Sequence, residues 1–216
     1  MLIRVFLVLL LVAVPAGAFE RTADYAKARV GPWRVNVSSG WQADPRGRDA
    51  ALQEVGRQLS VVLEVVPEPA LAVLTEVPIW LENAPLHDGA GQFHRSGFWL
   101  RDNGYNPGKV GAVELNRRVV EWRQAMPLVV LHELAHAYHH RALLERTPEI
   151  EAAFAAAQAS GVYGNAYAMT DPMEYFAELT EALFGQNDQT PRDRAELARI
   201  DPQGLALVAA LWGVAP

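Results

Sequence analysis

The chain of 216 residues contains no cysteine. Disulfide bonds, thiolate metal sites and cysteine nucleophiles are therefore excluded. Any metal ion in the protein must be held by histidine and carboxylate side chains. A chain of this length can bury a hydrophobic core without disulfide bonds, so their absence is compatible with an exported protein.

Clusters of lysine and arginine are missing as well. The chain has 19 basic and 25 acidic residues, which gives a formal net charge of −6. Nucleic acids and anionic membrane surfaces bind proteins through basic patches. We therefore expect neither of them as a partner.

Long hydrophobic runs are missing except at the start of the chain. Arg4 precedes the apolar run 5–14, and Pro15-Ala-Gly-Ala18 supplies the A-x-A pattern that signal peptidase cleaves. Residues 1–18 are therefore predicted to be a signal peptide, and residues 19–216 a single domain that is secreted or periplasmic and keeps no stable membrane anchor. The alternative is a retained N-terminal anchor, because the run is near the lower length limit for crossing a bilayer.

The N-terminal half combines one helix with extended segments. Apolar residues recur at three- and four-residue spacing between Arg48 and Val66, which predicts an amphipathic helix that ends before Pro67. The other segments are predicted to be β-structure because they are rich in β-branched and aromatic residues or flank turn residues. They are an extended segment at 28–37, a segment at 71–81, and a β-hairpin whose strands are 93–101 and 109–116.

The C-terminal half has a helical pattern. Helices are predicted at 127–146, from Pro148 onward, at 171–185 with Asp171 as N-cap and Pro172 as the first helical residue, and at 204–212. The predicted fold class is α+β: a small mixed β-sheet, an edge strand at 109–116 that precedes the first of these helices, and a helical C-terminal half.

Residues 130–138 carry a metal-binding motif, Val-Leu-His-Glu-Leu-Ala-His-Ala-Tyr. Residues four apart lie on one face of a helix, so His132 and His136 project side by side at a separation that suits one tetrahedral ion. Glu133 is rotated by ~100° around the helix. From there it can take a proton from a zinc-bound water without ligating the metal. The motif H-E-x-x-H therefore predicts a catalytic Zn²⁺ site.

The third zinc ligand must come from another segment. A further ligand from the same helix cannot easily close a tetrahedron, so the next histidines, His139 and His140, are interpreted as rim residues. Glu174 and Glu178 are four apart on the predicted helix 171–185 and share a face. We expect Glu174 to bind the metal and Glu178 to accept a hydrogen bond from the far nitrogen of a ligating histidine. The alternative is Glu178 as the ligand.

Residues 127–185 resemble the gluzincin metallopeptidases of the anthrax lethal factor and Pro-Pro endopeptidase kind. The likeness rests on His-Glu-Leu-Ala-His followed by Tyr-x6-Glu-Tyr-Phe-Ala-Glu. It implies a zincin-like fold with His132, His136 and Glu174 as zinc ligands and Glu133 as general base. It also implies that Tyr167, seven residues before Glu174, assists the transition state; the alternative is a packed or turn tyrosine.

The function expected from these features is hydrolysis of a peptide bond in a peptide or protein substrate. The resemblance further implies that the substrate binds as an extra strand at a sheet edge, for which 109–116 is the expected strand. Two alternatives use the same residues: a zinc-containing protein that only binds, and a hydrolase of another amide such as a cell-wall cross-link. A structural zinc site has four protein ligands and needs no adjacent base, so Glu133 favours an enzyme.

Overall fold

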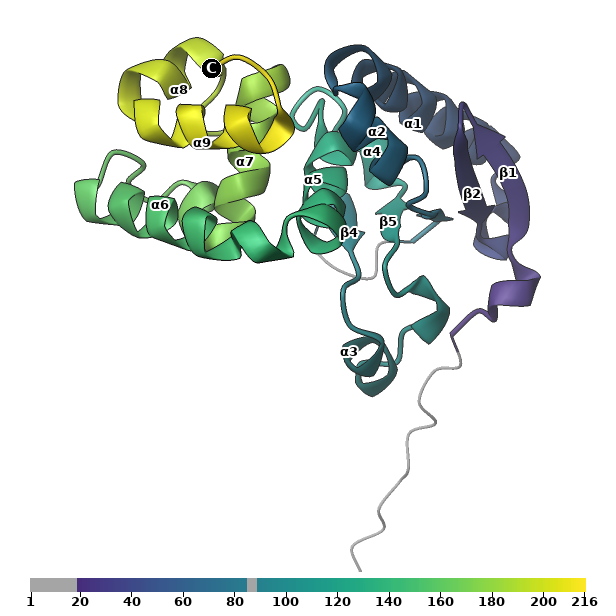
Figure 1. Ribbon diagram of the computed structural model, residues 1–216. Helices are drawn as coiled ribbons and strands as arrows, with labels where there is room; N and C mark the ends of the chain where they lie inside the picture. Colours follow the sequence, from purple (N-terminus) through teal and green to yellow (C-terminus); the bar gives the residue numbers. More distant parts are fainter. Residues whose placement is uncertain (1–18, 85–88) are drawn as a thin grey trace, which may run out of the picture.

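The computed structural model describes residues 19–84 and 89–216. The predicted signal peptide, residues 1–18, lies outside the described residues. The fold class is α+β, as predicted: a small mixed sheet lies on one side and a group of helices on the other (Figure 1). No helix in the described part of the chain is both long and apolar enough to cross a membrane.

The sheet has five strands in the order β1-β2-β3-β5-β4. Its pairings are antiparallel for β1 with β2, parallel for β2 with β3 and for β3 with β5, and antiparallel for β5 with β4. The strands are β1 (Ala26–Val30), β2 (Trp33–Val37), β3 (Ile79–Glu82), β4 (Gly91–Phe93) and β5 (Val113–Asn116). All residues of β3 and β5 are buried.

Nine α-helices are described. They are α1 (Pro45–Val65), α2 (Glu68–Leu74), α3 (Gly97–Asp102), α4 (Arg118–Glu121), α5 (Val129–Ala142), α6 (Thr147–Ser160), α7 (Pro172–Phe184), α8 (Arg194–Ile200) and α9 (Pro202–Trp212). Helix α5 packs against α1, α2, β4 and β5 and, on its other side, against α7. It therefore joins the sheet half of the molecule to the helical half (Figure 1).

Two of the segments predicted in the N-terminal half differ in part from the structure. The extended segment 28–37 is a hairpin, because Gly31 adopts a positive φ of 55° and reverses the chain between β1 and β2. Only residues 79–82 of the segment 71–81 form a strand. Its first part belongs to α2, which begins at Glu68, has Pro69 in its first turn, where proline is tolerated, and buries Ala70 and Leu74.

The predicted hairpin of 93–101 and 109–116 is also shorter than expected. Strand β4 pairs antiparallel with β5, but it ends at Phe93. Residues 97–102 form helix α3 instead, because the Ser96 hydroxyl accepts a hydrogen bond from the backbone N–H of Trp99 and caps the helix.

The prediction of an edge strand at 109–116 is wrong. Strand β5, within 109–116, is not an edge, because it lies between β3 and β4. The edge next to α5 is β4. The chain forms β4 first and then returns through α3 to insert β5 beside β3, an order of strands that local sequence does not reveal.

The helices of the C-terminal half agree more closely with the sequence pattern. Helix α7 begins at Pro172, is capped by Asp171 and ends before Gly185, as predicted. Helix α6 has Pro148 in its first turn. Helix α5 is shorter than predicted at both ends, because the residues 127 and 128 lie outside it and Leu144–Arg146 is a separate 3₁₀ turn. Helix α9 begins two residues earlier than predicted.

Candidate metal centre

Helix α5 places the motif residues at the boundary between sheet and helices. Its buried flank, which includes Val130, Leu131, Leu134 and Ala135, anchors the helix in the hydrophobic core. His132 and Glu133 are buried and His136 is partly buried. Polar groups that are removed from water need partners. The partners of these side chains lie on α7 and β4.

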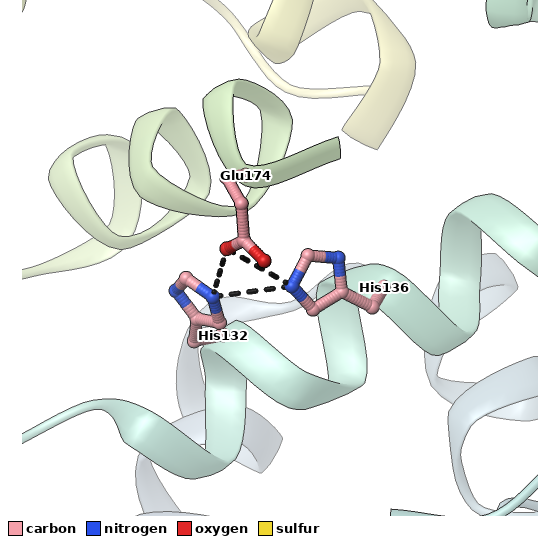
Figure 2. Close-up of side chains that lie close together, drawn as sticks. All are labelled: His132, His136 and Glu174. Atoms are coloured by element: carbon pink, nitrogen blue, oxygen red, sulfur yellow. Dashed lines mark hydrogen bonds and ion pairs between the residues drawn. The ribbon is translucent and has the colours of Figure 1, made fainter. Parts of the chain in front are cut away.

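Helix α7 brings Glu174 to the two motif histidines. Its Oε2 atom lies 3.0 Å from His132 Nε2 and 3.4 Å from His136 Nε2. The two Nε2 atoms are 3.2 Å apart. Figure 2 shows the three side chains pointing toward one common point from the two helices. Ligands at about 2.0–2.1 Å from a tetrahedral Zn²⁺ are roughly 3.3 Å apart, so the three atoms fit three corners of such a site.

The charge balance of this cluster also suits a cation. Burial, the largest influence on Glu174, raises the pKa of its carboxyl, but hydrogen bonds with His132 and His136 outweigh it and hold that pKa far below the ordinary value. Burial likewise lowers the pKa of His132, but hydrogen bonds to Glu174 and Glu181 raise it well above the ordinary value. The protein therefore stabilises positive charge at the point where the three side chains meet.

The other nitrogen of His132 faces two further carboxylates of α7. Its Nδ1 lies 2.8 Å from Glu181 Oε1 and 3.4 Å from Glu178 Oε1. Glu178 is also bound to Asn187, whose Nδ2 donates to Glu178 Oε2 at 2.8 Å. An acceptor at Nδ1 fixes the tautomer that leaves Nε2 free to ligate a metal. Glu178 therefore lies where the sequence placed it, but Glu181 makes the shorter contact.

Glu181 is the residue that the sequence prediction missed. It lies seven residues after Glu174 and thus on the same helical face as Glu174 and Glu178, so the spacing could have indicated it. The group of His132, Glu178 and Glu181 is itself close enough to hold a metal. It uses the buried Nδ1 side of the same ring, whereas the group with His136 and Glu174 lines the cleft.

Glu133 lies between α5 and the edge strand β4. Burial raises the pKa of its carboxyl above the ordinary value, and a backbone hydrogen bond from Phe93 acts in the opposite direction. Gly91 on β4 leaves the space that this side chain occupies: a Cβ atom there would lie 2.7 Å from Glu133 Cγ. The two motif histidines flank Glu133 in sequence and its carboxylate faces the same cleft as theirs.

An open cleft of about 390 Å³ exposes the cluster to solvent. Gly91, Phe93 and Arg95 line it from the sheet side, and Tyr167, Asp171 and Met173 line it from the side of α7. Tyr167 begins a short 3₁₀ helix (Tyr167–Met169) before α7, and its ring centroid lies 6.5 Å from that of His132. Burial, with the nearby Glu174 and Glu133 charges, raises the pKa of Tyr167, so its hydroxyl stays protonated and can donate.

His139 and His140 stand outside the three-atom cluster, in agreement with the sequence interpretation. The Nε2 atom of His139 lies 2.8 Å from Thr147 Oγ1. The ring of His140 packs near Phe93, with the centroids 5.5 Å apart. Both line the cleft and follow His136 along α5. Their contacts with other residues leave the metal cluster to His132, His136 and Glu174.

Comparisons of the chain with protein-family models, with curated proteins and with solved structures give no match.

Proposed function

We propose that the chain is a zinc-dependent metallopeptidase, with His132, His136 and Glu174 as the metal ligands. The observation that carries this proposal is the set of three ligand atoms 3.0–3.4 Å apart at the floor of an open cleft. Three protein ligands leave the fourth tetrahedral position to water or substrate, as in catalytic zinc sites. Zinc would supply Lewis acidity, which polarises the scissile carbonyl and lowers the pKa of water.

Glu133 is the proposed general base. It is not one of the three clustered ligand atoms, but it lies beside them and faces the cleft. A carboxylate whose pKa is raised is a more effective base near neutral pH. Glu133 takes a proton from the attacking water and then gives it to the leaving amine. Tyr167, on the opposite wall of the cleft, donates a hydrogen bond to the oxyanion that develops at the carbonyl.

Strand β4 is the proposed site of substrate pairing. The carbonyl of Ala90 and both backbone groups of His94 bond to the segment that contains β5. Backbone groups alternate in direction along an antiparallel strand, so those of Gly91 and Phe93 point away from β5. The N–H of Phe93 bonds to Glu133, so the backbone groups of Gly91 and the carbonyl of Phe93 are the ones offered to a peptide. An extended peptide can add to this edge as a further strand. A sheet edge that takes up the substrate is what the resemblance to the gluzincins implies, and we propose a zincin-like fold for this chain.

A peptide substrate and export beyond the inner membrane belong to the same proposal. The cleft is open along β4, which suits an extended chain, and the predicted signal peptide would direct the protein to the periplasm or the medium. Neither the cleft nor the edge strand selects between a peptide bond and another amide, such as a cell-wall cross-link.

The test is hydrolysis of a mixture of internally quenched peptides and, in parallel, of peptidoglycan fragments. The zinc-loaded protein should cleave peptides, and chelation should abolish the activity. Glu133→Gln should lower kcat by at least about a hundredfold, since it removes the base, whereas the exposed Glu145→Gln should retain activity. Cleavage of peptidoglycan fragments but not of the peptides would show that the substrate is another amide, such as a cell-wall cross-link. Cleavage of neither substrate would contradict an enzymatic role.

A further inference from the structure

Arg95 is a cation at the mouth of the cleft with no counterion among the described residues, 19–84 and 89–216. Among the described residues that line the cleft, it is the only lysine or arginine. The residue is exposed, and no carboxylate in the described part of the chain lies within 4.0 Å of its guanidinium. The arginine is therefore available to a group that comes from outside.

Other arginines near this part of the molecule are already engaged. Arg101 stacks on Phe98, with its guanidinium carbon 5.5 Å from the ring centroid. Arg141 donates to the carbonyl of Gly111 at 2.9 Å. Arg117 pairs with Glu121 at 3.1 Å. Arg95 faces the cleft, and none of these contacts involves it.

The backbone of Arg95 is held by its two neighbours. His94 is buried, and its Nε2 lies 2.9 Å from Glu114 Oε2 on β5. Its backbone N–H donates to the carbonyl of Ala112 at 3.0 Å. On the other side, Ser96 caps helix α3. Arg95 therefore presents an exposed charged side chain from a fixed backbone position just after β4, as a residue that recognises a substrate requires.

The acidic groups of the cleft are occupied by other partners. Asp171 accepts hydrogen bonds from the N–H groups of Met173 and Glu174 at 2.7 and 3.0 Å. Glu174 lies against the two motif histidines. Glu133 is packed against β4. On α5, the groups that face the Arg95 end of the cleft are His139 and His140, which offer no negative charge.

We propose that Arg95 binds a carboxylate of the substrate and so determines which peptides the enzyme cleaves. Arginine forms strong charge-assisted hydrogen bonds with carboxylates. A strand advances about 3.3 Å per residue. Arg95 lies two residues beyond Phe93 and four beyond Gly91, the residue that contacts Glu133. A peptide paired with β4 therefore places the carboxylate that Arg95 binds two to four residues from the bond that is cut. It comes from an aspartate or glutamate side chain or from the C-terminus of the peptide. This inference rests on the proposed function.

The test compares peptides that differ only in charge. Starting from a peptide that the zinc-loaded protein binds, each position within four residues of the cleaved bond is made Glu, Gln or Lys, and the C-terminus is made a free acid or an amide. Binding of the labelled peptides to the Glu133→Gln protein is measured by fluorescence anisotropy, and kcat/KM is measured with the active enzyme. Arg95→Gln and Arg95→Glu are compared with Arg101→Gln, which changes an exposed arginine of the same segment that does not line the cleft.

At one position, we expect the Glu peptide to be favoured over its Gln counterpart, or the free acid over the amide, by about five- to tenfold. This is the size of a charge-assisted contact that water partly screens. Arg95→Gln should abolish this preference, Arg95→Glu should reverse it toward lysine, and Arg101→Gln should retain it. A wild-type protein without charge preference, or a preference that survives Arg95→Gln, would overturn the inference. Hydrolysis without charge preference refutes only the role of Arg95, whereas charge-dependent binding without any hydrolysis refutes only the enzymatic activity.

Discussion

Gly91 of strand β4 lies directly against Glu133 of helix α5. A Cβ atom at position 91 would lie 2.7 Å from Glu133 Cγ and 3.0 Å from its Oε1, closer than real Cβ contacts allow. Any residue other than glycine at position 91 would therefore displace the carboxylate of Glu133. This contact ties the identity of a residue on the sheet edge to the position of the proposed base.

The first prediction is that Gly91→Ala lowers catalysis without removing zinc. The added methyl group forces Glu133 to shift, and a displacement of about 1 Å in a catalytic group can cost about a hundredfold in rate. We expect kcat to fall by about ten- to a hundredfold at unchanged zinc content. Gly97→Ala is the matched control, because a Cβ there meets Val110 only at 3.8 Å. Equal activities of the two variants would show that Gly91 does not position the base.

Tyr167→Phe tests the proposed hydrogen bond to the oxyanion. Removal of one such donor in other enzymes costs about 10²–10³ in kcat. Tyr167 is 45 % exposed, so we expect a smaller loss of about ten- to a hundredfold, with KM little changed. Steady-state kinetics on one peptide measures both constants.

The control for this variant is Tyr163→Phe. Tyr163 is buried, and its hydroxyl donates to Asp201 Oδ2 at 2.9 Å. Its loss should reduce the free energy of unfolding by about 1 kcal/mol and leave kcat unchanged. A Tyr167→Phe protein with full kcat would make this residue a packing or turn tyrosine.

Glu181→Gln should weaken zinc binding more than Glu178→Gln does. Glu181 is the closer acceptor for His132 Nδ1, at 2.8 Å against 3.4 Å, and Glu178 is shared with Asn187. Loss of such an outer partner typically costs 10- to 100-fold in metal affinity, a range of about 1.4–2.7 kcal/mol. Competition with a chelator of known affinity measures the dissociation constants. If Glu178→Gln weakened zinc binding more than Glu181→Gln, Glu178 would be the main acceptor for His132 Nδ1.

A buried charge network on the far side of β5 predicts a pH effect on stability. Lys109 Nζ lies 2.7 Å from both Glu82 Oε1 and Glu114 Oε2, and His94 contacts the same Glu114 oxygen. Burial, the largest influence, raises the pKa of Glu114, but His94 and Lys109 together lower it below its ordinary value of 4.5. The ionised form therefore stabilises the fold above pH 4.5, and this contribution is lost as the pH falls from 4.5 through the lower pKa of the folded state.

Urea unfolding at several pH values measures this effect. From pH 7 to pH 3, the free energy of unfolding should fall more steeply for the wild type than for Glu114→Gln, which cannot titrate at this position. Glu149→Gln, an exposed residue outside the network, should behave as the wild type within a few tenths of a kcal/mol. Identical slopes for the wild type and Glu114→Gln would show that the network does not hold an ionised Glu114.

Local sequence signals predicted the helical half and the cluster on it. Asp171, Pro172 and Gly185 mark both ends of α7. The i,i+4 spacing of His132 and His136 places their side chains together whatever surrounds the helix. Glu174 could be expected beside them because a three-ligand site needs a carboxylate when cysteine is absent, although its spacing alone did not distinguish it from Glu178.

The sheet half depended on contacts that are distant in sequence. The segment 93–101 is rich in residues that favour strands, but the Ser96 cap turns its second part into α3. The position of β5 inside the sheet follows from its pairing with β3, in which Ile79 lies opposite Val113, 34 residues later in the chain. Strand order, and with it the identity of the edge at Glu133, is set by such non-local pairing and is not encoded in the pattern of one segment.

The zinc content of the purified protein tests the central claim most directly. We predict one zinc per chain in the wild type, a large loss in Glu174→Ala, and retention in Glu178→Ala, measured by elemental analysis after dialysis against buffer without metal. Circular dichroism of each variant shows whether the fold is kept. A wild-type protein without zinc after reconstitution, or a folded Glu174→Ala variant that keeps its zinc, would contradict the metal centre formed by His132, His136 and Glu174.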